Sequence, residues 1–245
     1  MNKVEKIFNL RSSFYNYESS WSTDQNLNRL CQELIISNNK DKNLTVLDYG
    51  CGTGNLSRKI WQHCKYIDVV DISSEMLELC DFARNKYKIP DKPIYEKYDR
   101  IILRQVLQYY KKEVWNELFD YLLSLLNPNG YILFSQITPY KEFDLGYWQK
   151  LVRARRPERL SFPTEEDILN LAKEENLNLI ELIESYTTQS LNQWINNADN
   201  QTKIMITEIF RQADQVTKTL WKIREQENDI LWQNHWCHIK IGTKD

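Results

Sequence analysis

The residues best suited to chemistry begin with a glycine-rich stretch, VLDYGCGTGN (46–55). Three of the chain's six glycines, Gly50, Gly52 and Gly54, lie within five residues. Glycine tolerates positive φ and lets the backbone approach a ligand closely, so three of them suit a sharp turn against a bound molecule. A plain strand-to-helix turn would account for one glycine only. The spacing is GxGxG, whereas a dinucleotide-binding loop carries GxGxxG, and this disfavours a nicotinamide oxidoreductase.

Polar side chains also occur near the ends of the next apolar runs. Asp71 lies at the end of YIDVVDI (66–72), and Arg104 and Gln105 lie within DRIILRQVL (99–107). A carboxylate has two acceptor oxygens, so Asp71 could hold both hydroxyls of a sugar diol. Arg104 is interpreted either as a contact to a reacting group or as part of a structural ion pair.

No pattern typical of a metal site or a disulfide framework is found. The five cysteines are scattered, and no pair has CxxC spacing. His235 and His238 lie on an alternating segment, where an odd separation predicts opposite faces of a strand. We therefore expect no metal cofactor, and the cysteine pattern favours a reducing, cytoplasmic compartment.

Short apolar runs alternate with helical patterns, and together they predict the elements that position these residues. Asp24 or Thr23 is the expected cap of an early helix, Ser73 or Ser74 opens another, and Thr164 with Asp167 resembles a capping box. The tail DILWQNHWCHIKI alternates like a half-buried strand. The other expected strands are 44–50, 66–72, 93–96, 99–107, 131–137 and 177–186, and the expected helices include 53–63, 112–126, 164–176 and 189–226.

Strands that alternate with helices predict a mostly parallel sheet with right-handed crossovers. The apolar runs are short and continuous, which suits strands covered on both faces. Ligands of such sheets bind outside the carboxyl ends of the strands, near the point where the strand order reverses. The glycine-rich stretch, Asp71 and Arg104 are therefore expected to meet at one edge of the sheet.

The segment VLDYGCGTGNLS resembles motif I of class I S-adenosylmethionine (SAM)-dependent methyltransferases, an acid followed by GxGxG. VVDIS (69–73) and LNPNGYILFSQI (126–137) also resemble segments of this family. The resemblance is close over 44–137 and loose over 164–186. It implies an α/β fold, a Rossmann-like seven-stranded mostly parallel sheet with helices on both faces and a helical lid. The expected units are an N-terminal helical lid segment (1–40), the core (41–186), a helical cap insertion (187–227) and the final strand of the core sheet (228–245).

The resemblance implies SAM as cofactor, S-adenosylhomocysteine (SAH) as product, and no metal. In the family the acid corresponding to Asp71 binds the ribose, and the residue corresponding to Ile72 packs on adenine. The segment between Asp71 and Asp99 is shorter than usual, and the missing part normally holds strand three and an adenine-binding pair. Either Glu96 substitutes for that pair or the adenine site is open. The cofactor-binding residues expected are Asp48, Gly50, Cys51, Gly52, Gly54, Asn55, Asp71, Ile72, Met76, Arg104 and Gln105.

The expected activity is SN2 transfer of a methyl group to O, C or N of a small, aromatic or polyketide-like acceptor. Arg104, Tyr15 and Tyr17 are the catalytic candidates, since the N-terminal region has no histidine to act as a base. The alternatives are a SAM-binding non-catalytic or repurposed homologue, and a tRNA or protein methyltransferase. The amino-methylating (D/N/S)PP(Y/F) box is absent, and LRQV stands in its place. The expected substrate-lining residues are Trp21, Tyr109, Tyr140, Trp148 and Trp194.

Composition narrows the range of partners. The formal net charge is −2, which argues against nucleic acid, because phosphate-binding surfaces usually carry a basic excess. The basic run over 153–159 is interpreted as a solvated loop or helix face, with a local basic patch as the alternative. The N-terminus lacks a signal-peptide pattern, and no apolar run approaches the ~20 residues that span a bilayer. The sequence leaves the oligomeric state open.

Overall fold

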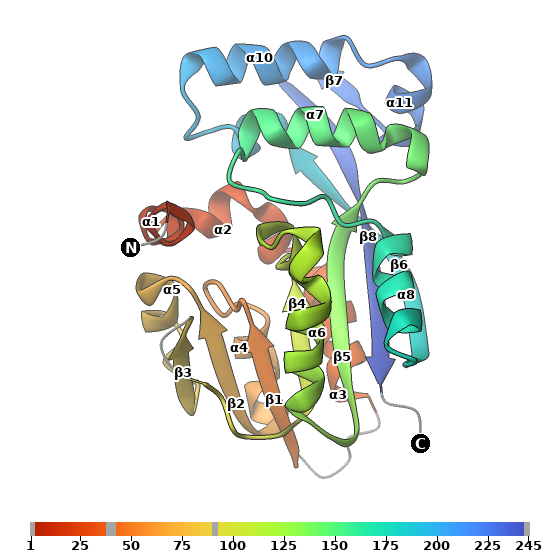
Figure 1. The fold of residues 1–245 in the computed structure, drawn as a ribbon. Helices are drawn as coiled ribbons and strands as arrows, with labels where there is room; N and C mark the ends of the chain where they lie inside the picture. Colours follow the sequence, from red (N-terminus) through yellow and green to blue (C-terminus); the bar gives the residue numbers. More distant parts are fainter. Residues whose placement is uncertain (1–2, 38–42, 90–92, 243–245) are drawn as a thin grey trace.

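A single twisted sheet forms the centre of the molecule (Figure 1). The computed structural model describes residues 3–37, 43–89 and 93–242. The strand order in the sheet is β3-β2-β1-β4-β5-β8-β6, and the short β7 pairs with β8 outside this path. β1 to β5 run parallel, whereas β8 is antiparallel to β5 and to β6. The strands are β1 (Leu44–Tyr49), β2 (Cys64–Asp71), β3 (Asn85–Lys88), β4 (Tyr98–Arg104), β5 (Leu126–Thr138), β6 (Asn178–Ser190), β7 (Arg224–Gln226) and β8 (Asp229–Gly242).

Helices cover both faces of the sheet, as the continuous apolar strands require. On one face α3 (Gln25–Ile36) and α4 (Ser57–Ile60) pack on a cluster that includes Val46 and Ile102. On the other face α6 (Trp115–Ser124) and α8 (Glu165–Glu174) pack on a cluster that includes Leu47 and Ile101. Neighbouring strand residues thus point to opposite faces and are buried on both. The predicted Rossmann-like α/β fold is confirmed.

Caps predicted from the sequence begin several of these helices. The Asp24 carboxylate accepts a hydrogen bond from the Leu27 N–H at the start of α3, at 2.8 Å. Ser73 caps α5 (Ser74–Glu78), and Thr164 with Asp167 forms the capping box of α8. Each cap satisfies backbone N–H groups that a helix leaves unpaired.

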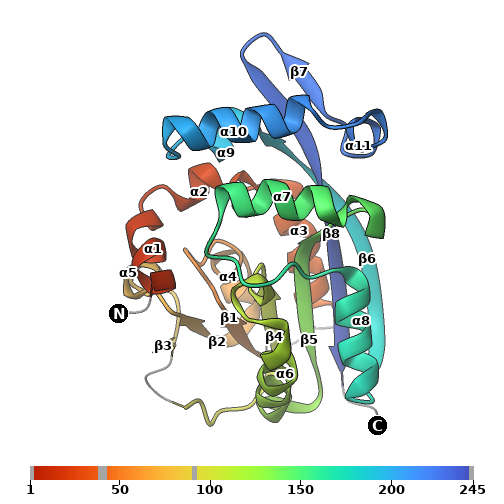
Figure 2. The same ribbon diagram turned by 45° about the horizontal axis from the view of Figure 1, so that its top comes forward.

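The two longest strands carry a second layer beyond the end of the parallel sheet. β5 pairs with β8 only as far as Thr138 and His235, whereas β6 and β8 continue pairing to Ser190 and Leu231. Figure 2 shows α7 and α10 lying across this extension, above the sheet. We call this layer the cap. Its elements are α7 (Leu145–Arg155), α9 (Leu191–Trp194), α10 (Asn200–Arg211), α11 (Gln215–Leu220) and β7.

The N-terminal helices lie over the carboxyl ends of β1 and β2, beside the cap (Figure 1). They are α1 (Lys3–Arg11), α2 (Tyr15–Glu18) and the 3₁₀ turn η1 (Ser20–Ser22). An ion pair of 2.8 Å between Glu5 and Lys88 ties α1 to β3. The carboxyl edge of the sheet is therefore closed by N-terminal helices on one side and by the cap on the other.

The structure corrects several sequence predictions. Strand three is present as β3, although its segment is short, and the predicted strand at 93–96 is absent. The helix predicted at 53–63 begins only at Ser57, because the glycine-rich loop occupies the residues before it. The helix predicted at 189–226 is three helices, since Asp199 and Asp214 each cap a new one, and it ends in β7.

Gly54 gives a test of how tightly the loop packs on the helical layer. Its φ is +71°, and a Cβ there would lie 2.7 Å from the Cys80 Sγ. We expect Gly54→Ala to lower the free energy of unfolding by about 2–4 kcal/mol, because left-handed backbone strain and overpacking add. Urea unfolding measures the loss. Gly146→Ala is the matched control, because a Cβ at Gly146 in α7 meets nothing within 4 Å. Equal midpoints for the two variants would contradict the packing described.

Candidate active site

The glycine-rich loop leaves β1 in a conformation that only glycine adopts readily. Gly50, Gly52 and Gly54 all have positive φ, between +54° and +78°. The N–H groups of Gly50 and Cys51 donate to the Val70 carbonyl at 2.8 and 3.0 Å, which fastens the loop to β2. A Cβ on Gly50 would lie 2.5 Å from a methyl carbon of Val106. The loop backbone therefore passes close to both neighbouring strands and leaves room in front of it.

Asp71 joins the loop to the end of β2. Its Oδ2 accepts a hydrogen bond from the Gly52 N–H at 2.8 Å, and its Oδ1 accepts one from the Ser73 N–H at 2.9 Å. The residue is only 7% exposed. Burial raises the pKa of Asp71 to about 6, because desolvation outweighs the hydrogen bonds that stabilise the charged form. A carboxylate of this kind keeps acceptor capacity on both oxygens and faces a cavity.

That cavity has a volume of about 560 Å³, within the range of small-molecule sites, and we call it the main cavity. The loop and β2 supply Gly50, Gly52, Asp71 and Ile72 to its wall. Helix α1 supplies a second wall. The remaining lining residues come from the loop after β4, from β1, from the β3 end and from α2. Outside the loop and β2, they are Val4, Glu5, Phe8, Tyr15, Tyr49, Ile89, Arg104, Gln105, Val106, Tyr109 and Tyr110.

Asp48 and Arg104 border a smaller pocket of about 20 Å³ next to the loop. The Ser57 hydroxyl donates to the Asp48 carboxylate at 2.5 Å, and burial raises the pKa of Asp48. Arg104 donates to the Asn28 side-chain oxygen at 2.8 Å and lies over the Trp21 ring. Arg104 is thus held by α3 and η1, and its hydrogen bond goes to an amide.

Gln105 is the most unusual residue of the site. It is 6% exposed, its φ is +59°, and its side-chain Nε2 has no hydrogen-bond partner. The Gln136 Nε2 donates to the Gln108 Oε1 at 2.9 Å, and the Gln108 Nε2 donates to the Gln105 Oε1 at 3.2 Å. This chain of amides orients Gln105 so that its unused N–H₂ is the terminal donor. Backbone strain and an unsatisfied buried donor together are typical of functional positions.

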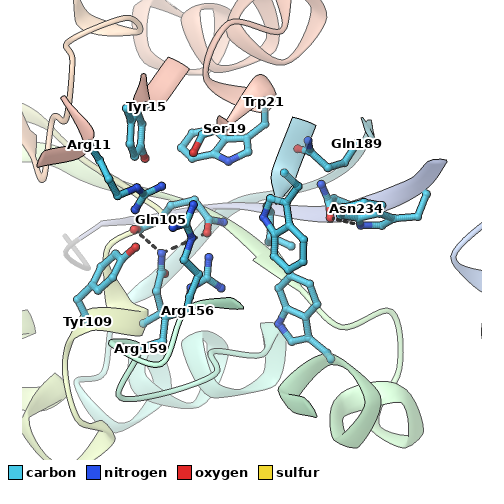
Figure 3. Close-up of a pocket in the computed structure, with 15 residues that line it drawn as sticks. Arg11, Tyr15, Ser19, Trp21, Gln105, Tyr109, Arg156, Arg159, Gln189 and Asn234 are labelled. Atoms are coloured by element: carbon cyan, nitrogen blue, oxygen red, sulfur yellow. Dashed lines mark hydrogen bonds between the residues drawn. The ribbon is translucent and has the colours of Figure 1, made fainter. Parts of the chain in front are cut away.

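A second pocket adjoins the main cavity, and Gln105, Tyr15 and Tyr109 line both of them. Figure 3 shows this second pocket. We call it the inner pocket. Its volume is about 30 Å³, and it lies between the core and the cap. In Figure 3, Arg11, Arg156 and Arg159 gather at the end near Gln105, while Gln189 and Asn234 lie at the other end. The remaining lining residues are Ser19, Trp21, Gln108, Ile137, Trp148, Trp194 and Trp232.

Most of the residues singled out in the sequence lie in one of these three cavities. The expected cofactor residues Cys51 and Asn55 line the small pocket beside the loop, with Asp48. The expected substrate residues Trp21, Tyr109, Trp148 and Trp194 line the inner pocket. The structure thus brings the predicted cofactor and substrate residues to adjoining spaces.

A few of them lie elsewhere. Tyr17 is 54% exposed at the surface, and Met76 of α5 is fully buried. Tyr140 donates to the Gln233 carbonyl at 2.9 Å and stacks on His235 of β8. Gly54 packs against Cys80. None of these four lines the cavities described, so we leave them out of the proposed site.

Glu96 and the two histidines also have local partners. Glu96 accepts a hydrogen bond from the Tyr87 hydroxyl at 3.1 Å and lines none of the described cavities. His235 pairs with Thr138 and His238 with Ser135, each at 3.0 Å. Over residues 3–37, 43–89 and 93–242, no group of three His, Cys, Asp or Glu side chains could hold a metal ion.

The basic run was interpreted as a solvated face, and the structure contradicts this for two of its members. Arg155 and Arg156 are 9% and 7% exposed, and both donate to the Glu18 carboxylate, at 2.6 and 2.7 Å. Arg11 is also buried, 3.4 Å from the same carboxylate. No sequence pattern pointed to Glu18, which α2 places at the centre of these arginines. Only an unusual density of arginine at 153–159 hinted at a buried cluster.

The fold and the cavities define a Rossmann-like α/β protein with a ligand site at the carboxyl edge of its sheet. Comparison with known proteins gives the family. The methyltransferase domain family matches residues 22–182, so this chain belongs to that family. The predicted class, a class I SAM-dependent methyltransferase, is confirmed.

Individual relatives are more distant. The malonyl-[acyl-carrier protein] O-methyltransferase of Halalkalibacterium halodurans is 33% identical over 120 residues, 43% of this chain and 44% of that protein. The chain spans about half the length of the curated relatives it matches. The YcgJ protein of Bacillus subtilis has a TM-score of 0.77 at 15% identity, over 89% of this chain and 99% of its own. Magnesium protoporphyrin IX methyltransferase of Synechocystis, with bound SAH, gives 0.57 at 15% identity, over 96% and 97%.

The buried cluster around Glu18 predicts a strong effect on stability. We expect Glu18→Gln to lower the free energy of unfolding by about 3–5 kcal/mol, because it leaves buried arginines without their counter-ion. The arginines hold the pKa of Glu18 below its ordinary value against the opposing effect of burial. This stabilisation is therefore present above the unfolded pKa and lost as the pH falls through the lower folded pKa.

Urea unfolding at pH 7 and at pH 4 measures both effects. Glu208→Gln is the control, because its pair with Arg211 lies at the surface of α10 and such pairs contribute about 0–1 kcal/mol. A loss for Glu18→Gln no larger than for Glu208→Gln would show that the cluster does not hold the N-terminal helices.

Proposed function

We propose that this chain transfers the methyl group of SAM to a small acceptor, part of which enters the inner pocket. The observation that carries the proposal is the hydrogen bond between Asp71 and the Gly52 N–H at the wall of the main cavity. It sets an acidic side chain and a ligand-accessible loop side by side at the carboxyl edge of a parallel sheet. That edge is where ligands of such folds bind.

The lining residues fit the parts of SAM. Asp71 would accept hydrogen bonds from the hydroxyls of the ribose. Ile72 and Val106 would offer apolar surface to the adenine. The amino-acid end would reach the small pocket beside the loop, where Asp48, Asn55 and Arg104 offer groups of both charges. The volume of about 560 Å³ is sufficient for a ligand of this size.

When bound, SAM supplies an electrophilic methyl group and its own leaving group, so the protein mainly aligns the partners. Gln105, Tyr15 and Tyr109 border both cavities and would flank the point of transfer. Burial raises the pKa of Tyr15, so its hydroxyl keeps its proton at neutral pH and could donate a hydrogen bond to a ligand. Helix α1 and the cap would exclude water from the reaction.

The segments expected as lid and cap fit this role. Residues 1–40 include the helices over the carboxyl edge, and 187–227 include α9, α10 and α11 of the cap. The name of the matched relative points to an acyl acceptor, and the aromatic wall of Trp21, Trp148 and Trp194 suits an acceptor with apolar surface. In the described residues no helix is long and apolar enough to cross a membrane. A cytoplasmic location stays a prediction.

Ligand binding tests the cofactor assignment directly. We expect SAM and SAH, but not NAD, to raise the melting temperature, because a ligand of the folded state stabilises it by RT ln(1 + [L]/Kd). Asp71→Asn keeps the shape but loses the charge, and should weaken SAH at least about ten-fold, the loss expected for a charge-assisted hydrogen bond. Asp81→Asn is the matched control, because Asp81 is exposed and pairs with Arg58. Unchanged SAH affinity in Asp71→Asn would remove Asp71 from the ribose site.

The pH dependence of SAH binding follows from the pKa of Asp71 of about 6. The ionised carboxylate accepts hydrogen bonds from ribose, whereas the protonated form loses part of that capacity. We expect SAH to bind about ten-fold more weakly at pH 5 than at pH 7 by isothermal titration, as the ionised fraction falls. Asp71→Asn should flatten the profile even though Asp48 remains. A profile equally steep in the variant would assign the titration to another group.

A further inference from the structure

The inner pocket differs from the main cavity in its charge. Its titratable lining residues are Arg11, Arg156, Arg159, Tyr15 and Tyr109, and no described carboxylate lines it. Glu18 balances part of this positive charge, because its carboxylate accepts hydrogen bonds from Arg155 and Arg156, although Glu18 does not line the pocket. Burial lowers the pKa of Arg156 to about 10, and the neighbouring Arg11 and Arg155 act in the same direction.

A count of charges gives the same result. The cluster contains the buried arginines Arg11, Arg155 and Arg156 and the half-buried Arg159, against two buried glutamates, Glu18 and Glu158. Four positive charges thus face two negative ones between the N-terminal helices and the cap. Buried charges are costly unless they are paired. This excess favours a ligand that carries negative charge.

Several donors at this end of the pocket have no hydrogen-bond partner. Arg11 is 6% exposed, and one of its Nη atoms is unpaired, whereas its Nε lies 3.4 Å from the Glu18 carboxylate without forming a hydrogen bond. The Arg159 Nε and the Gln105 Nε2 are buried and unpaired in the same way. The donors come from α1, from the segment between α7 and α8, and from the end of β4, so three separate parts of the chain converge on one space. Such convergence of unsatisfied donors is typical of a site for an acceptor-rich group.

The size of the pocket limits that group. A water molecule needs roughly 10–15 Å³ of space for its centre. The inner pocket offers about 30 Å³, which is enough for two oxygen-sized atoms. A carboxylate has two oxygens in one plane and matches the fork of an arginine, whereas a phosphate is larger and carries more oxygens.

We propose that the inner pocket binds a carboxylate group of the methyl acceptor, through Arg11, Arg159 and the Gln105 side-chain amide. That this carboxylate belongs to the methyl acceptor rests on the proposed function, whereas binding of a carboxylate in the inner pocket does not require turnover. Gln105, Tyr15 and Tyr109 belong to both cavities, so a carboxylate held here lies at the junction with the main cavity. The acceptors expected are therefore carboxylic acids, and their neutral amides should bind more weakly.

Binding of matched acids and amides tests the proposal without relying on activity. The full chain, saturated with SAH, is titrated calorimetrically at pH 7 with straight-chain carboxylates from acetate to hexanoate and with their primary amides, at constant ionic strength. We expect at least one carboxylate to bind about ten-fold or more tightly than its amide, because charge-assisted hydrogen bonds replace neutral ones. Equal affinities for acid and amide, or no binding of any of them, would overturn the proposal.

Two variants locate the preference. Arg159→Gln and Gln105→Leu should each reduce the preference for acid over amide at least about five-fold, the loss expected when a charged or buried donor is removed. Arg153→Gln is the matched control, because Arg153 is exposed on α7, where its guanidinium lies over Phe162. It should leave the preference unchanged. Preference retained in both pocket variants would overturn the assignment of the site.

The SAH affinity separates this proposal from the one on which it rests. It is measured for each variant before the acids are added. If SAH fails to bind the unaltered chain, the proposed function fails. If SAH binds the unaltered chain and the variants alike, and acids still bind no better than amides, only the carboxylate site fails.

Discussion

The hydrogen bond from the Gly52 N–H to the Asp71 carboxylate is the contact on which the rest of the site depends. It fixes a loop that has three positive φ values and would otherwise have many conformations of similar energy. The same side chain lies at the cavity wall. Its ionised form is only weakly favoured there, because burial raises its pKa to about 6. A ligand that donates hydrogen bonds to this carboxylate would supply the stabilisation that burial removes. Loop geometry and ligand affinity are thus linked through one residue.

The second constraint is the attachment of the N-terminal helices to the cap. Glu18 of α2 bonds Arg155 and Arg156 near the end of α7, across more than half of the chain. Sequence-distant contacts of this kind close the acceptor side without contributing apolar area. They also leave an excess of positive charge, because Glu18 and Glu158 supply two negative charges against four arginines. The same charges that hold the lid against the cap give the inner pocket its preference for anions.

The core and the cofactor edge were predictable because their signals are local. The three glycines Gly50, Gly52 and Gly54 predict a sharp turn. The place of Asp71 at the end of an apolar run predicts its position at the carboxyl end of a strand. The acceptor side was not predictable to the same degree. Glu18, Arg11 and Gln108 owe their roles to contacts between segments far apart, which leave no periodic pattern. β3 was missed for a related reason, since NKYK has no apolar run and is a strand only through its pairing with β2.

Strands β6 and β8 explain how one sheet can serve both sides of the reaction. Their extension past Thr138 carries the cap, so the inner pocket is built on the same hydrogen-bonded ladder that closes the sheet. Gln136 lies on β5 beside that ladder, and the amide chain from Gln136 through Gln108 sets the direction of Gln105. The cap is therefore tied to the core through the backbone hydrogen bonds of β6 and β8 as well as through apolar contacts. Rigid coupling of this kind favours precise alignment of two ligands, which is the main contribution that a protein makes to a methyl transfer.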